Sequence, residues 1–157
     1  MFVYGITPAV GTTLTCSGTP NTEVDQLAVI AGTGRTTSVL RILVHGRGGA
    51  LTAISGITWR VKRWTTGSSG GTAITPVAFD PGAQAAKCTA AAVPTAGSVD
   101  GAIRLSFGCG AAGPGGWVAE NPDAMLVLES ASGDSYDLYN ASATASLTAD
   151  ASMAVVE

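Results

Sequence analysis

Glycine and proline recur along the whole chain, 21 and 7 of them in 157 residues, and this punctuation limits the fold more than any other feature. Both residues weaken a helix interior, and no segment between them sustains the i, i+3, i+4, i+7 apolar pattern of an amphipathic helix. The intervals instead suit strands of roughly 4–8 residues. The sequence therefore predicts an all-β protein, and its length suits a single domain.

Alternation of apolar and polar side chains marks the clearest strand, Ile57–Thr65, whose odd positions begin apolar while its even positions carry cations. The other predicted strands are Thr12–Ser17, Gln26–Ala31, Ser38–His45, Thr72–Phe79, Ala102–Phe107, Ala124–Glu129, Ser135–Tyr139, Ala143–Thr148 and Met153–Val156. About nine or ten short strands separated by turn residues indicate a single β-sandwich or a barrel.

Connecting segments give further expectations. The Gly/Ser cluster Thr66–Gly71 predicts a hairpin loop, and Pro76 in the returning strand predicts an edge position or a bulge. The Ala-rich segment Gly82–Ala92 suits a helix, a strand or an extended loop. Residues 1–12 are candidates for an N-terminal arm that reaches onto a neighbour, which leaves 13–157 as the sandwich domain.

Charge is scarce, at 12% of residues, and unevenly distributed. Residues 1–79 carry six basic and two acidic residues, whereas 80–157 carry two basic and nine acidic residues. Such segregation suits electrostatic contact between identical subunits. Alternatively, strand pairing mixes the two halves in space, and the charge asymmetry then cancels on the folded surface. The net charge of −3 does not favour a nucleic-acid partner.

The motifs that carry chemistry fail on inspection. Gly108–Gly113 spells G-x-G-x-x-G, but Pro114 follows where a helix would have to begin, so no dinucleotide cofactor is expected. His45 is the single histidine and no G-x-S-x-G elbow accompanies it, which leaves a small hydrolase as a weak alternative. The three cysteines form no C-x-x-C pair and are expected to be buried thiols. We therefore expect neither an enzyme, nor a metal site, nor a cofactor.

Cations and aromatic residues supply the candidate interface. The strand face that carries Arg60, Lys62, Arg63 and Trp64 suits a protein interface, a platform for single-stranded nucleic acid, or a solvated surface. The full candidate set is Phe2, Tyr4, Arg41, Arg60, Lys62, Arg63 and Trp64.

Several phrases of the sequence point to one family. Asp80-Pro81-Gly82-Ala83-Gln84-Ala85-Ala86, Gly116-Trp117-Val118 and Glu120-Asn121-Pro122, with a small-residue strand ending in Glu157, resemble head decoration (cement) proteins of tailed bacteriophages and related capsid-associated β-sandwich proteins. The resemblance implies a jelly-roll-like sandwich that binds the outer surface of the head as a homotrimer, with the major capsid protein as its partner.

Localisation and the alternative function follow from the same sequence. No apolar run reaches the roughly 18–20 residues of a membrane helix and no export signal is present, so synthesis in the host cytoplasm and residence on the virion are expected. The alternative is a tail- or fibre-associated module that recognises host-surface glycans through Trp59, Trp64 and Trp117.

Overall fold

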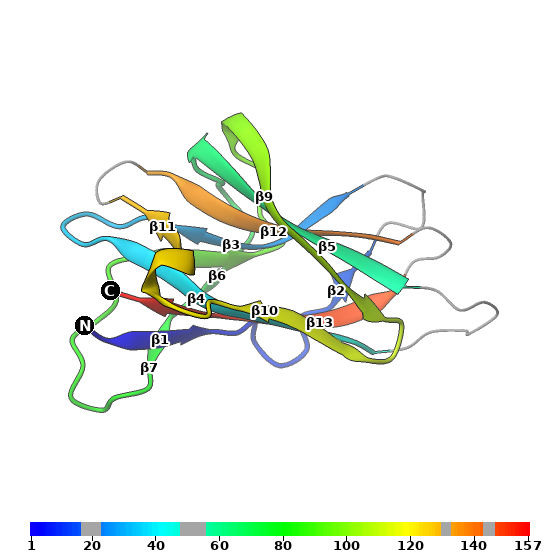
Figure 1. Cartoon of the computed structure of the whole chain (residues 1–157), viewed down its shortest axis with the longest axis horizontal. Coiled ribbons are helices and arrows are strands. Elements are labelled where there is room, and N and C mark those ends of the chain that lie inside the picture. The colour runs from blue at the N-terminus through cyan, green and yellow to red at the C-terminus, as the bar shows by residue number, and fades with distance from the viewer. Residues whose placement is uncertain (17–22, 48–55, 130–132, 143–146) are drawn as a thin grey trace.

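The chain forms two antiparallel β-sheets that face each other, as Figure 1 shows for a computed structural model that describes residues 1–16, 23–47, 56–129, 133–142 and 147–157. The one helical element in those ranges is the short 3₁₀ turn Pro122–Ala124. No helix in the described ranges is long and apolar enough to cross a membrane. The all-β prediction is confirmed, and the architecture is that of a β-sandwich.

The first sheet has the order β10-β4-β13-β1-β7, with β11 paired to β4 and β2 paired to β13. Its strands are β1 (Val3–Ile6), β2 (Leu14–Thr15), β4 (Thr37–Gly46), β7 (Val77–Ala78), β10 (Pro114–Val118), β11 (Leu126–Leu128) and β13 (Thr148–Val156). The second sheet has the order β6-β8-β3-β12-β5-β9. Its strands are β3 (Val24–Ile30), β5 (Gly56–Thr66), β6 (Thr72–Ile74), β8 (Thr89–Ala92), β9 (Ser98–Gly110) and β12 (Ser135–Ser142).

Strand pairing is nested from the ends of the chain inward. The first strand pairs with the last, β1 with β13, and β3 pairs with β12 on the other sheet. Further in, β4 pairs with β10 and β5 pairs with β9. Because successive members of these pairs belong to alternate sheets, the chain crosses repeatedly between the two layers.

The core lies between the sheets and is built by the alternation read from the sequence. On β5, Ile57, Trp59 and Val61 are buried and point inward, while the positions between them point outward. Strands β4 and β13 bring Ile42 and Met153 into register from the opposite sheet, and both are buried. Apolar side chains from both inner faces thus fill one cluster.

Most predicted strands overlap observed ones, but the count of nine or ten is too low, because the described residues alone form thirteen strands. Strand β10 lies just after Gly108–Gly113, where no strand was predicted, and β8 settles the ambiguous Ala-rich segment as a strand over Thr89–Ala92. Predicted strand Ala143–Thr148 lies mostly outside the described residues, as does Ser17.

The predicted hairpin at Thr66–Gly71 is wrong. Both sides of β5 are occupied, by β12 and β9, so β6 pairs instead with β8 at the far edge of that sheet. The single strand predicted over Thr72–Phe79 is interrupted at Pro76. Strand β6 ends before Pro76 in the second sheet, and β7 begins after it at the edge of the first sheet, so Pro76 lies where the chain changes sheets.

The expected N-terminal arm is, over Val3–Ile6, a strand of the sandwich. Strand β1 lies between β13 and β7, and Tyr4 and Ile6 are buried in the core. Phe2 and Glu157 exchange backbone hydrogen bonds of 2.8 and 3.0 Å, which fixes the two ends of the chain side by side (Figure 1).

Candidate interaction surfaces

The cationic face predicted from the sequence is neutralised within the chain. Glu23 forms ion pairs with both Arg60 and Lys62, and Arg63 pairs with Asp134 at 2.5 Å. Burial alone would raise the pKa of Glu23, but hydrogen bonds from the two cations outweigh it and lower that pKa. Arg60 and Lys62 therefore form a paired outer surface of the second sheet, not a free cationic patch, whereas Arg63 lies on the other side of β5, opposite the core residue Tyr136.

Trp64 lies under a neighbouring segment of the chain. A Cβ added at Gly101 would lie 2.6 Å from the indole ring, and one at Gly97 would lie 2.6 Å from the Trp64 Cβ, so both glycines pack directly on this side chain. The ring of Tyr139 lies 6.4 Å away at 55°, with the Lys62 ammonium 4.4 Å above it. Stacking a base or a sugar on Trp64 would require this segment to move.

The two aromatic candidates near the N-terminus serve the fold. Tyr4 is 1% exposed, and its hydroxyl donates a 2.8 Å hydrogen bond to the backbone oxygen of Gln84. Phe2 is half-buried and packs against the core. Neither projects from the surface as an arm would.

Arg41 differs from the other cations. It lies on the outer face of the first sheet, opposite Val118 on β10 and Ala154 on β13. Within the part of the chain that the structure describes, no carboxylate pairs with it. Leu43, two positions along β4 on the same face, is 42% exposed, and Val118 is 54% exposed.

The same row of the sheet continues to its far edge. Ala154 is opposite Gly5, and Gly5 is opposite Val77, so these residues share the face that carries Arg41. A Cβ at Gly5 would lie 3.1 Å from the ring of Phe79, which therefore lies over this face and remains 60% exposed. We call Arg41, Leu43, Val77, Phe79 and Val118 the sheet-one face. The sequence nominated only Arg41, because β10 and β7 were not resolved as separate strands.

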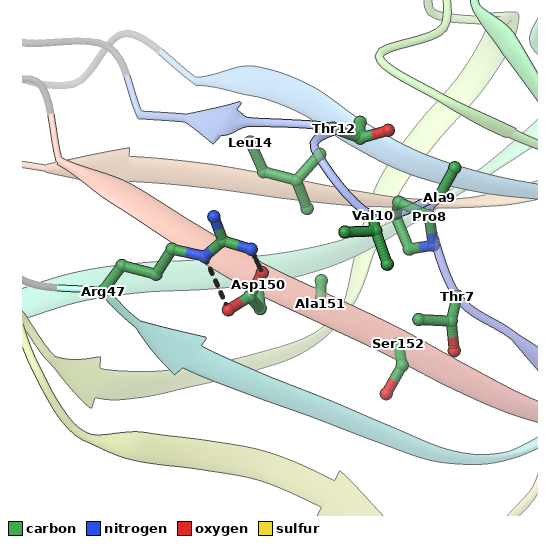
Figure 2. Close-up of a pocket in the computed structure, with 10 residues that line it drawn as sticks. All are labelled: Thr7, Pro8, Ala9, Val10, Thr12, Leu14, Arg47, Asp150, Ala151 and Ser152. Atoms are coloured by element: carbon green, nitrogen blue, oxygen red, sulfur yellow. Dashed lines mark hydrogen bonds and ion pairs between the residues drawn. The ribbon is translucent and has the colours of Figure 1, made fainter.

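A cavity of about 270 Å³ adjoins this face between the Thr7–Thr12 segment and β13 (Figure 2). Arg47 spans its side with a bidentate ion pair to Asp150, which lowers the pKa of that carboxyl. The hydroxyls of Thr7 and Ser152 also line it. Its lining residues include no thiol or imidazole, and both oxygens of its one carboxylate, Asp150, accept hydrogen bonds from Arg47.

A second cavity, of about 510 Å³, lies where the ends of the chain meet. Its acidic residue, Glu157, accepts hydrogen bonds from the backbone N–H groups of Lys87, at 2.8 Å, and Cys88, at 2.6 Å. Burial would raise the pKa of Glu157, but these hydrogen bonds lower it. Glu157 thereby ties the end of β13 to the segment that leads into β8.

The residues considered for catalysis do not form a site. His45 is exposed at the end of β4, opposite Pro114 and Asp150. Burial raises the pKa of Cys16 to about 11 and that of Cys88 to about 12, which makes both weak nucleophiles. Among the described residues, no three His, Cys, Asp or Glu side chains lie together as metal ligands.

The tryptophans considered for glycan stacking are largely unavailable. Trp59 is fully buried, and its indole N–H points to the Cys109 sulfur at 3.3 Å. Trp117 is half-buried and packs against the core. With Trp64 also covered, the described surface presents no exposed tryptophan face.

Comparison with protein-family models, curated proteins and solved structures finds no match for this chain.

Proposed function

We propose that this protein is a non-enzymatic structural component of a tailed-phage virion, which binds the outer surface of the head and stabilises the shell. The resemblance of its local sequence to decoration proteins supports this. The nested pairing supports it as well, since β10-β4-β13-β1 and β3-β12-β5-β9 have the strand order of a jelly roll. Jelly rolls are common in viral capsid proteins, although fold alone does not define function.

The observation that carries the proposal is the sheet-one face. It places exposed apolar side chains around one cation with no carboxylate partner in the described ranges. Protein interfaces combine such an apolar centre with arginine and few other charges. We assign this face to contact with the major capsid protein, in place of the cationic face that the sequence favoured.

A homotrimeric assembly completes the proposal. Three copies fixed together would bind a symmetric lattice through three equal contacts, and the high effective concentration of the second and third contacts lets each be weak. Binding is then expected on assembled shells and not on free capsid subunits.

The test is co-sedimentation of the purified protein with assembled shells. Val118→Asp is expected to lower shell binding at least tenfold, because it places a charge among the apolar side chains of the contact. Ile103→Asp is the matched control, since Ile103 is 52% exposed on β9 of the other sheet. Equal binding by both variants would exclude the sheet-one face, and no binding by the unaltered protein would exclude the function.

Copy number separates the head from the tail. Quantitative mass spectrometry of purified virions is expected to find this protein at a fixed ratio to the major capsid protein, in hundreds of copies. A few dozen copies would instead place it at the tail, a fibre or a vertex and return the glycan-binding alternative to consideration.

A further inference from the structure

Two segments of the chain cover one end of the outer face of the second sheet. We call residues 66–71 and 93–101 the cover. Ser69 and Thr95 join the two segments by reciprocal backbone hydrogen bonds of 3.1 and 2.8 Å. Gly67 is tied by its N–H to the carbonyl of Gly133 at 2.9 Å. Beneath the cover lies Trp64, packed against Gly97 and Gly101.

The longer segment of the cover is strained. Val93 has φ of 49° and Val99 has φ of 64°. These are left-handed conformations that β-branched residues rarely adopt, and they persist only where the surrounding structure enforces them. Both valines are also exposed, at 47% and 68%, so little apolar burial compensates the strain. The cover therefore needs specific bonds to stay closed.

Besides these backbone bonds and the pairing of Ser98 and Asp100 with β5, a set of side-chain bonds converges on Asp137, a fully buried residue of β12. The Ser68 hydroxyl donates to the Asp137 carboxylate, and the Gly97 N–H donates to the Ser68 oxygen at 3.0 Å. The Ser68 N–H in turn donates to Ser135 at 3.2 Å. One carboxylate thus holds both segments of the cover through a single serine.

A second carboxyl group, that of Asp25 on β3, lies against the first. Asp25 is 7% exposed, and among the described residues neither of its oxygens has a hydrogen-bond partner at normal distance and angle. A buried carboxylate without such donors is far less stable than the neutral acid. Burial and the adjacent Asp137 raise the pKa of Asp25 to about 9, and they outweigh the lowering effects of Tyr139, which lies opposite on β12, and of Lys62.

The cations that strand β5 places on this outer face are already ion-paired with another carboxylate. Strand β5 contributes Arg60 and Lys62, and Glu23, just before β3, pairs with both. The other flanking strands add little: β8 carries alanines beside β3, and β12 adds Tyr139, whose pKa is raised by burial. Arg104 of β9 lies at the irregular register opposite β5. Because Glu23 engages both Arg60 and Lys62, neither aspartate of the pair has an ion-pair partner among the described residues.

We propose that a proton shared by Asp25 and Asp137 holds the cover closed, and that its loss releases the cover and exposes Trp64. Without the proton, two adjacent buried carboxylates repel each other. Separation of Asp137 from Asp25 breaks its bond to Ser68, which frees the strained segment around Val93 and Val99. This inference does not depend on the proposed shell-binding function.

The experiment follows hydrogen exchange of the cover and acrylamide quenching of tryptophan fluorescence from pH 6 to pH 10. In the unaltered protein, exchange of residues 66–71 and 93–101, corrected for the intrinsic pH dependence, is expected to rise at least tenfold across this range. Asp25→Asn keeps the shape but cannot ionise, so its cover is expected to stay closed to pH 10. Asp123→Asn, an exposed change in the 3₁₀ turn, is the control and should behave as the unaltered protein.

The variant Ser68→Ala and the addition of Ca²⁺ test the two remaining steps of the proposal, the link through Ser68 and the shared proton. Ser68→Ala removes the link to both segments and is expected to open the cover at every pH, while circular dichroism confirms that the sheets remain. A pH-independent cover in the unaltered protein, or the same opening in Asp25→Asn, would overturn the proposal. Closure of the cover by millimolar Ca²⁺ at pH 9 in the unaltered protein, absent from Asp25→Asn, would also overturn it by showing a cation between the carboxylates.

Discussion

Trp59 shows how one residue sets the core. It is the largest fully buried side chain, and its ring lies on the inner face of β5 with its N–H directed at Cys109. Trp59→Ala is expected to lower the free energy of unfolding by about 3–5 kcal/mol, since it leaves a large cavity between close-packed sheets. Urea denaturation measures this. Val127→Ala, at a 43% exposed position, is the control and should change stability by less than about 1 kcal/mol.

The paired cations show why residue roles resisted prediction. Alternation in Ile57–Thr65 identified which side chains of β5 point outward, and this was correct. It could not identify Glu23 and Asp134 as partners, because they lie 37 and 71 residues away in the sequence, just before β3 and β12. The mixing of basic and acidic halves by strand pairing is confirmed for Arg63 with Asp134 and Arg47 with Asp150.

At the scale of elements, β1 is the clearest departure from expectation. The segment before the Thr7–Thr12 loop is short, which favoured the prediction of an arm. Tyr4 and Ile6, however, are two residues apart in a strand, so both side chains point to the same side and enter the core. Deletion of residues 1–6 is therefore expected to prevent cooperative unfolding or to lower Tm by more than 10 °C, since it empties the core and exposes the edge of β13. Deletion of Met1 alone, which is 95% exposed, should change Tm by less than about 2 °C in the same calorimetric scan.

Elements with strong β-branched alternation, such as β4 and β5, were predicted nearly to their bounds. Strand β10 was missed because its sequence, PGGWV, has the composition of a turn and forms a strand only by pairing with β4. The hairpin at Thr66–Gly71 failed for a similar reason: partner choice depends on strands distant in sequence, and local turn chemistry does not contain it.

For the whole molecule, the carboxyl groups predict a stability maximum in mildly acidic solution. Glu23 and Glu157 have lowered pKa values, so the stability they contribute is present above their ordinary pKa and is lost as pH falls through the folded-state pKa. Asp25, with its pKa raised to about 9, contributes stability that is fully present below its ordinary pKa and is lost as pH rises through that range.

Thermal denaturation between pH 3 and pH 10 measures both the loss of stability at low pH and the loss at high pH. Tm is expected to rise from pH 3 to about pH 5 and to decline above pH 6, while Asp25→Asn flattens the alkaline decline and leaves the acid limb unchanged. A maximum at pH 8 or above in the unaltered protein would contradict the assignment of a neutral Asp25.

The pairing of β1 with β13 has a consequence for how the chain reaches this state. Strand β1 is synthesised well before β13 and cannot pair until β13 has emerged, and β3 likewise cannot pair with β12 until later. Loop-closure entropy must be overcome before these distant contacts form, so folding is expected in the range of milliseconds to seconds, and largely after β13 has been synthesised. During that interval the apolar faces of both sheets are open to other nascent copies. Successful production of this protein thus depends on the rate of refolding relative to aggregation as well as on the final stability.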